Sequence, residues 1–101
     1  MPLPPDIQKK IDAGLLQVIR EVNAQLPKPG RLEESLGERL SGKGCKLDSL
    51  GLVNFLVLTE HVLERELGRR LSLTSVMEAD ESYLTDVRAL SRYVFEILSR
   101  G

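Results

Sequence analysis

The chain has 101 residues, which is enough for one domain with its own core and too few for two. Its 14 basic and 15 acidic residues nearly balance, and it has no Trp, two Tyr and two Phe, so a basic, aromatic-rich surface for nucleic acid is not expected. The sequence contains neither an apolar run of about 18 residues nor a leader pattern, which predicts a cytoplasmic protein outside the membrane. The single cysteine, Cys45, has no partner for an internal disulfide and fits a reducing compartment.

The N-terminal part predicts a first helix from about Asp6 to Gln25. Asp6 offers a cap after a proline-rich start, and Pro27 and Pro29 stop the pattern because proline lacks a donor N–H. Between them the apolar residues recur at helical spacing, at Ile7, Ile11, Leu15, Val18, Ile19, Val22 and Leu26.

A long loop is expected from Arg31 to Leu47, with one possible helical turn from Leu32 to Leu36. Glycines at 37, 42 and 44 interrupt any longer helix. A loop of this length in a small domain needs contacts with the core. The expected anchors are its leucines, Leu32, Leu36, Leu40 and Leu47.

A second long helix is predicted from Leu50 to Leu67, stopped by Gly68 beside several arginines that suit its negative end. Because residues three and four apart share a face, one stripe of this helix is assigned to the core: Leu52, Phe55, Leu56, Thr59, Leu63 and Leu67. Three apolar residues then lie closer to the surface, Leu50, Val53 and Val57. They either lie beneath the long loop or contact a partner.

The C-terminal part predicts one turn of helix around Glu78 to Tyr83 and a final helix capped by Thr85 or Asp86. The apolar face of that final helix comprises Val87, Leu90, Val94, Ile97 and Leu98. Three longer helices, one short helix and no alternating strand pattern predict an all-α bundle.

A serine stands at the start of the second long helix, directly after a glycine-bearing loop, in the segment Asp48-Ser49-Leu50. One interpretation is structural: Asp48 or Ser49 caps the free N–H groups of the first turn. The other is chemical: an exposed hydroxyl here would place a phosphodiester at the positive end of the helix dipole. The local pattern leaves both open.

An Asp-Ser-Leu segment that opens the second of three long helices, in a chain of about a hundred residues, resembles the acyl carrier protein family. The extended form Leu47-Asp48-Ser49-Leu50-Gly51 is also similar to D-alanyl carrier proteins and to stand-alone carriers that serve dedicated ligases. The resemblance runs from the first helix to Tyr93. It implies a four-helix bundle and a single carrier domain over residues 1–101, with flexible ends at 1–5 and 99–101.

The resemblance also implies a function. Ser49, with Asp48 and Leu50 as the other motif residues, would receive 4′-phosphopantetheine from coenzyme A through a phosphopantetheinyl transferase. The thiol of that arm would hold an acyl or aminoacyl group as a thioester in fatty acid or secondary metabolite biosynthesis. Such a protein is a monomeric carrier and not an enzyme.

The surface expected to meet partner enzymes comprises Leu50, Val53, Val57, Glu60 and Glu64. Fatty-acid-synthesis carriers usually have acidic residues just after the motif, whereas this chain has Gly51 and Asn54. The expected partner is therefore a dedicated acyl or aminoacyl ligase or synthase.

Two alternatives stay open. In the first, the protein is a helical adaptor that binds a partner helix through Leu50, Val53 and Val57, with Ser49 only a cap. In the second, it is a small enzyme, but no base and nucleophile are paired in the sequence.

His61 has no second ligand at metal-binding spacing, and Cys45 is expected to be inert although it lies four residues before Ser49.

Overall fold

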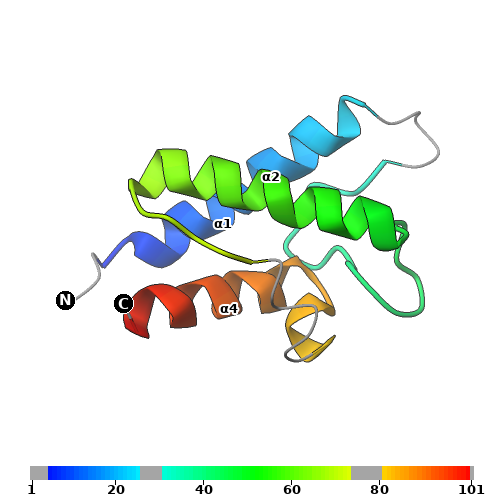
Figure 1. Cartoon of the computed structure of the whole chain (residues 1–101). Helices are drawn as coiled ribbons and strands as arrows, with labels where there is room; N and C mark the ends of the chain where they lie inside the picture. The colour runs from blue at the N-terminus through cyan, green and yellow to red at the C-terminus, as the bar shows by residue number, and fades with distance from the viewer. Residues whose placement is uncertain (1–4, 26–30, 74–80, 101) are drawn as a thin grey trace.

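The computed structural model describes residues 5–25, 31–73 and 81–100 of the chain. These ranges contain three α-helices and one short 3-10 helix (Figure 1): α1 (Ile7–Asn23), α2 (Ser49–Leu67), η2 (Glu81–Leu84) and α4 (Val87–Arg100). Within them no strand forms, and β-type pairing is confined to an isolated antiparallel bridge between Arg39 and Asp86. The predicted all-α class is confirmed.

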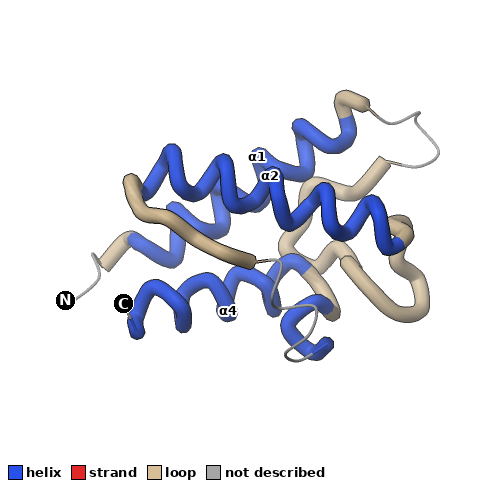
Figure 2. The backbone as a smooth tube through the Cα atoms, in the orientation of Figure 1, coloured by secondary structure: helices blue, strands red, loops and turns tan. Residues whose placement is uncertain are grey.

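Helix α1 packs against both α2 and α4, and η2 packs against α4. Helix α1 begins, and α2 and α4 end, at the same end of the molecule (Figure 1). The first turn of α2 lies at the opposite end, beside the loop that connects α1 to α2 (Figure 2). The residues predicted to carry chemistry are therefore remote from the start of α1 and from the end of α4 (Figure 1).

The boundaries of α2 and α4 follow from local capping, whereas Asp6, the predicted cap of α1, stands at the N-cap position but its side chain forms no capping hydrogen bond. Helix α2 begins at Ser49, one residue before the predicted start, and ends where Gly68 takes a left-handed φ of 68° and donates its N–H to Glu64 O at 2.8 Å. Of the two residues predicted to cap α4, the cap is Asp86, whose Oδ1 accepts from Ala89 N at 2.8 Å. Helix α1 ends at Asn23, two residues before the predicted Gln25.

Most of the core consists of the predicted apolar stripes and loop anchors, but Leu71, Leu73 and Leu84 are also buried in it and were not assigned to it from the sequence. The buried members on the three long helices are Ile7, Ile11, Leu15, Val18, Ile19, Leu52, Phe55, Leu56, Val62, Leu63, Val87, Leu90, Val94 and Leu98. Val62 was not predicted, whereas the predicted Val22, Leu67 and Ile97 lie half-buried at the edge of the core. Thr59 is fully buried and donates its hydroxyl to Phe55 O at 2.8 Å, so its polar group is satisfied.

Helices α1 and α2 approach closely at Gly14. A Cβ at this position would lie 2.6 Å from Leu63 Cδ2, and Leu63 is fully buried. Glycine within a helix costs about 0.5–1 kcal/mol relative to alanine, but here only glycine lets the neighbouring leucine fill the interface.

A polar cluster joins α1 to α4. Ser91 is buried and donates its hydroxyl to Asp12 Oδ1, while Gln8 Nε2 donates to the same oxygen at 3.2 Å and to Ser91 Oγ. Each of the three groups therefore has a partner, as buried polar groups require.

The connection between α1 and α2 is irregular and contains no helical turn at Leu32 to Leu36, contrary to the possibility raised by the sequence. Its anchors are as predicted: Leu32 and Leu40 are buried, and Leu36 and Leu47 are half-buried against the core. Asn23 holds the start of the loop, because its side chain accepts from Leu32 N at 2.7 Å and donates to Leu32 O at 2.8 Å.

Three backbone hydrogen bonds tie this loop to the start of α4. They join Val87 N to Glu38 O at 3.0 Å, Leu40 N to Thr85 O at 3.1 Å, and Arg88 N to Leu36 O at 2.8 Å. The loop is thus part of the packed structure and not a loose connection.

Three predicted features fall wholly or partly outside the described residues. Leu26, predicted as the last apolar residue of the first helix, lies outside, as do Pro27 and Pro29, which were predicted to stop that helix. The short helix expected around Glu78 to Tyr83 corresponds to η2 from residue 81 onward, and 78–80 lie outside. Of the expected flexible ends, 1–4 and 101 also lie outside, while Ser99 and Arg100 continue α4, with Ser99 Oγ donating to Phe95 O at 2.9 Å.

Replacing Phe55 by alanine should lower the free energy of unfolding by roughly 3–5 kcal/mol, because the ring is fully buried and its removal leaves a cavity. Urea unfolding at neutral pH measures the loss. Leu50→Ala on the same helix is the control: Leu50 is 68% exposed, so its truncation should change stability by no more than about 0.5 kcal/mol. Equal losses in the two variants would show that the faces of α2 are wrongly assigned.

Candidate functional site

The start of α2 is capped by Asp48 and not by Ser49. Asp48 has an extended backbone, its Oδ1 accepts from Gly51 N at 2.7 Å, and its carbonyl accepts from Leu52 N at 2.9 Å. Ser49 is the first residue of the helix proper. Of the two capping residues that the sequence allowed, the aspartate therefore performs this role.

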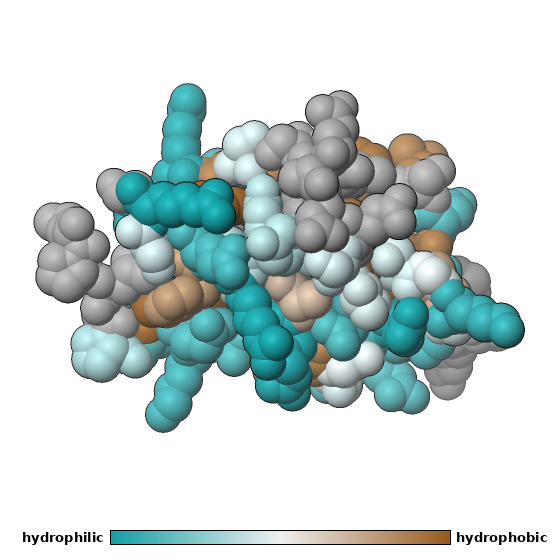
Figure 3. Space-filling model, turned by 90° about the horizontal axis from the view of Figure 1, so that it is seen from below, coloured by the Kyte–Doolittle hydropathy of each residue, from teal (hydrophilic) through white to brown (hydrophobic). Residues whose placement is uncertain are grey.

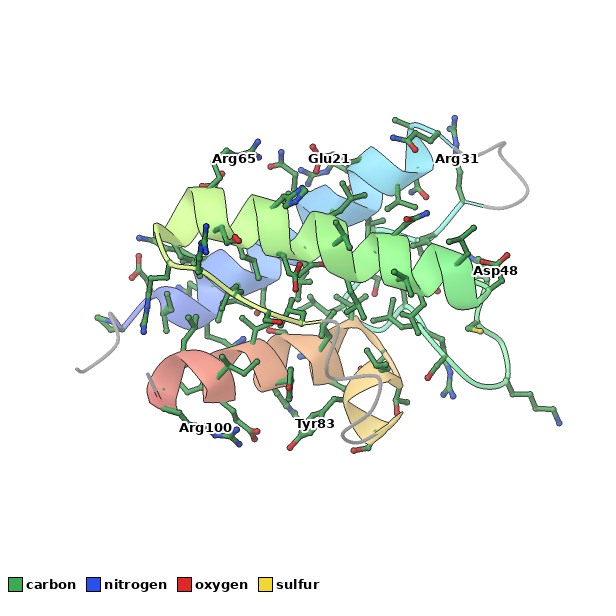
Figure 4. The ribbon with its side chains drawn as sticks, viewed as in Figure 1. Glu21, Arg31, Asp48, Arg65, Tyr83 and Arg100 are labelled. Carbon is green, nitrogen blue, oxygen red and sulfur yellow. The ribbon has the colours of Figure 1, made fainter. Side chains whose placement is uncertain are left out.

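The first turn of α2 contains no acidic residue. Asp48 precedes the turn, and its carboxylate is engaged by the N–H of Gly51 (Figure 4, right end of α2). The backbone N–H of Leu50 has no acceptor among the described residues. An anion beside this turn would therefore meet a free N–H and the positive end of the helix dipole.

Next to this turn lies the most exposed apolar side chain. Leu50 is 68% exposed and is the one large hydrophobic residue classed as exposed among the described side chains. Val53 and Val57 are half-buried. All three are more exposed than the fully buried residues of the predicted core stripe, such as Phe55 and Leu63, as predicted.

A hollow with a volume of 400 Å³ lies on the α1 side of α2, next to Val57. Val57 and Leu58 line it from α2, Val22 from α1 and Leu47 from the loop, with Asn54 and His61 among its polar members. His61 is exposed, in agreement with the predicted surface position.

A second hollow lies beside the first turns of α2 and was not predicted. We call it the Arg39 cleft; it has a volume of 470 Å³ and is lined by Arg39, Ser41, Gly42, Leu52, Ser82, Leu84 and Thr85. Its members come from the long loop, from α2 and from the region of η2, which are distant in sequence. No local pattern could have assembled them.

The loop before Asp48 is held by an ion pair between the buried Glu38 and the exposed Lys46, which was also not predicted. Glu38 is 9% exposed, and its Oε2 accepts from Lys46 Nζ at 3.1 Å and from Glu33 N at 2.7 Å. Burial raises the pKa of Glu38, but hydrogen bonds from the backbone of Glu33 and from Lys46, together with the charge of Lys46, outweigh it and leave the pKa below its ordinary value.

The two glutamates predicted to contact partners differ in their surroundings. Glu60 is half-buried and its Oε2 accepts from Leu73 N, so this carboxylate holds the segment that follows α2. Leu73 itself is fully buried. Glu64 is half-buried too, and its carbonyl is used in the cap at Gly68. Contact with a partner stays a prediction for both.

Cys45 is half-buried and its thiol donates to Leu47 O at 3.4 Å. Within residues 5–25, 31–73 and 81–100, no group of three His, Cys, Asp or Glu side chains could hold a metal ion. In the same ranges, no helix is long and apolar enough to cross a membrane.

The face formed by α4 differs from the surface around Leu50. Polar and charged side chains predominate on the described part of this face, and its apolar surface is divided into small areas (Figure 3). Small scattered apolar areas are normal on a protein surface and indicate no partner. The first turns of α2, with Leu50 and the two hollows, are the stronger candidate site.

Comparison of the chain with protein-family models, with curated proteins and with solved structures finds no match. The segment around Ser49 and the residues that surround it therefore provide the indications of function.

Replacing Glu38 by glutamine should lower the free energy of unfolding at pH 7 by about 1–2 kcal/mol, since the charge-assisted bond with Lys46 is lost. Because the folded pKa is depressed, the stabilisation is present above the unfolded value of about 4.5 and disappears as the pH falls through the folded pKa. The difference between wild type and variant should therefore shrink in acid.

Urea unfolding between pH 7 and pH 3 measures this difference. Glu34→Gln is the matched control, because Glu34 pairs with Arg20 at the surface, with both side chains more than half exposed, and should change stability little at any pH. A Glu38→Gln penalty that is the same at both pH values would contradict the assignment.

Proposed function

We propose that the protein is a carrier of the acyl-carrier type, in which Ser49 bears 4′-phosphopantetheine. The observation that carries the proposal is the division of roles at the start of α2. Asp48 provides the cap, so the serine in the Asp-Ser-Leu segment is not needed to satisfy the helix N-terminus. A serine that directly follows the capping residue, and that opens α2 at the end of the molecule opposite the start of α1 and the end of α4 (Figure 1), suits a point of attachment.

The surroundings of Ser49 fit the group. A phosphodiester there would lie beside the free N–H of Leu50 and the N-terminal end of a 19-residue helix, both of which favour an anion. No acidic residue in the first turn opposes it. When bound, the arm supplies a thiol that holds an acyl or aminoacyl group as a thioester.

The chain's own residues would present the arm and dock partner enzymes. The loop held by Glu38 and Lys46 leads directly into Asp48, so the attachment point has a defined position on the bundle. Leu50 supplies exposed apolar surface next to it. A long flexible arm raises the effective concentration of cargo at a docked enzyme, so that a weak contact suffices.

The partners proposed are a phosphopantetheinyl transferase and a dedicated acyl or aminoacyl ligase or synthase. Gly51 and Asn54 stand where fatty-acid-synthesis carriers usually have acidic residues, and Leu50 exposes a large apolar side chain next to Ser49. We further propose that the protein acts as a cytoplasmic monomer and has no catalytic activity of its own.

A helical adaptor is the second candidate. The observation that favours it is the same exposed Leu50, with Val53 and Val57 on neighbouring positions of α2, since an apolar helix face can bind a partner helix. The two functions differ at Ser49, which an adaptor does not need to have modified.

Incubation with coenzyme A and a broad-specificity phosphopantetheinyl transferase should add one phosphopantetheinyl group to the wild type and none to Ser49→Ala. Intact-mass spectrometry measures the addition. Ser72→Ala, which removes an exposed serine from the segment after α2, is the control and should be modified like the wild type.

Because Asp48 caps the helix, Ser49→Ala should keep its stability to within about 0.5 kcal/mol, whereas Asp48→Ala should lose about 0.5–2 kcal/mol. Modification of the Ser49→Ala variant would overturn the site, and an unmodified wild type would favour the adaptor.

Val53→Asp and Val57→Asp should impair loading of the modified protein by its dedicated enzyme, since each places a charge in an apolar contact. Both side chains are half-buried, so circular dichroism and thermal melting must first show that the variants fold. Ser72→Asp, which introduces the same charge at an exposed position beyond the far end of α2 and outside both hollows, is the control and should load well.

Loading should also tolerate added salt, because charged contacts are screened over about 8 Å at physiological ionic strength and apolar contacts are not. Efficient loading by fatty-acid-synthesis enzymes that is strongly salt-sensitive and indifferent to the aspartates would contradict the proposed partner class.

A further inference from the structure

The Arg39 cleft has the composition of a binding site for an anion with an apolar stem. Its volume of 470 Å³ falls within the range of pockets that hold small molecules. The apolar members Leu52 and Leu84 are buried and form part of its lining. The polar members are a guanidinium and hydroxyl groups from two separate segments, 39–42 and 82–85.

Two of these polar groups are uncommitted. Neither the guanidinium of Arg39 nor the hydroxyl of Thr85 forms a side-chain hydrogen bond or an ion pair with any residue of the described ranges, in contrast to Ser41, whose hydroxyl donates to Leu84 O at 2.8 Å. Both can donate hydrogen bonds, and the guanidinium is permanently charged.

The backbone fixes where these donors stand. Arg39 and Asp86 form the isolated β-bridge, and Leu40 N donates to Thr85 O at 3.1 Å, so the segments that carry Arg39 and Thr85 are held side by side. Gly42 lies under the arginine: its φ is +78°, and a Cβ there would be 3.2 Å from Arg39 Nη2. A larger residue at 42 would be strained and would displace the guanidinium.

The acidic groups adjacent in sequence to Arg39 and Thr85 do not compete for the arginine. Glu38, which precedes Arg39, is paired with Lys46 at 3.1 Å and does not line the cleft. Asp86 follows Thr85, but its carboxylate accepts from Ala89 N at 2.8 Å and is absent from the residues that line the cleft. Among the described lining residues the charge is therefore positive.

The cleft adjoins the proposed attachment point. Leu52 lies three residues after Ser49 on α2, which is a rise of about 4.5 Å along the helix axis. A phosphopantetheine arm is several times longer than this, so a group at its end can turn back onto the cleft.

We propose that the Arg39 cleft binds a short aliphatic chain that ends in a carboxylate, presented as the thioester cargo of the arm on Ser49. The carboxylate pairs with Arg39 and accepts from the Thr85 hydroxyl, and the methylene groups lie against Leu52 and Leu84. The inference rests on the proposed carrier function for the tethered form, and the same chemistry can be tested with the free acid.

The first experiment uses the protein loaded through the transferase with glutaryl- or pentanoyl-coenzyme A, two chains of equal length that differ in the terminal carboxylate. Amide shifts of Gly42, Leu52 and Thr85 in heteronuclear NMR spectra report on the cleft. The glutaryl form should shift these amides, relative to the unloaded holo-protein, roughly three- to fivefold more than the pentanoyl form, the scale of one partly exposed ion pair.

Arg39→Gln should reduce the glutaryl shifts to the pentanoyl level. Arg39→Lys should retain part of them, because lysine keeps the positive charge but lacks the planar guanidinium that binds a carboxylate through two N–H groups. Arg70→Gln is the matched control: it removes the same charge from an exposed position beyond the far end of α2 and should leave the shifts unchanged. Equal shifts for the two cargoes, or glutaryl shifts that survive Arg39→Gln, would overturn the proposal.

The second experiment titrates the unmodified protein with monomethyl glutarate and with the neutral dimethyl ester, and does not depend on Ser49. Shifts of the same three amides with the anion alone, abolished in Arg39→Gln, support the cleft even if the transferase leaves Ser49 unmodified, in which case only the tethered source fails. If these amides shift in neither experiment, the proposed binding in the Arg39 cleft is overturned, whether or not Ser49 is modified.

Discussion

The position of α2 depends on how the preceding loop is pinned to the start of α4. A helix of the bundle can rotate and slide as long as its apolar stripe stays buried, so the stripe alone does not define where the first turn stands. Two kinds of contact provide the missing constraint. Backbone hydrogen bonds run from Val87 N to Glu38 O and from Leu40 N to Thr85 O, and Glu38 forms an ion pair with Lys46. The cap, the exposed Leu50 and both hollows are arranged around that constrained segment.

The cap at Asp48 separates stability from chemistry. Its carboxylate accepts from the N–H of Gly51, so this N–H does not need a serine hydroxyl as its acceptor. A carrier needs this separation, because its attachment residue exists in modified and unmodified forms and the fold must tolerate both. The same reasoning would give the sequence motif a physical basis: the aspartate caps the helix, and the proposed attachment at the serine would not remove that cap.

The helices and the core were predictable because their signals are local. Apolar residues at helical spacing identified the buried faces of all three long helices, including Phe55 and Leu63 at the centre, and glycine and aspartate marked the ends of the helices. The sequence also identified the exposed Leu50. Val62 was missed because it lies beside the predicted stripe, and its burial depends on the close approach of α1 at Gly14.

The remaining features could not be predicted, since they join residues that are far apart in the chain. Lys46 and Glu38 carry no periodic signal, and nothing in the sequence indicates that Arg39 meets Thr85 across 46 positions. Glu60 looked like a free surface carboxylate until the chain after α2 placed Leu73 N against it. Such contacts depend on loop paths, which the pattern of apolar residues does not encode.

The tether between the loop and α4 also has a consequence for the order of folding. Helix α2 and its cap need only neighbouring residues, whereas Val87 must find Glu38 across 49 positions, and such long-range contacts pay the entropy of closing a large loop. A chain still being synthesised can thus form the helix that begins at Ser49 well before the loop around it takes its final path. If Ser49 is modified as proposed, an enzyme that recognises the loop and the helix together would act only on completed chains, and the proposed modification would then report that the whole domain has folded.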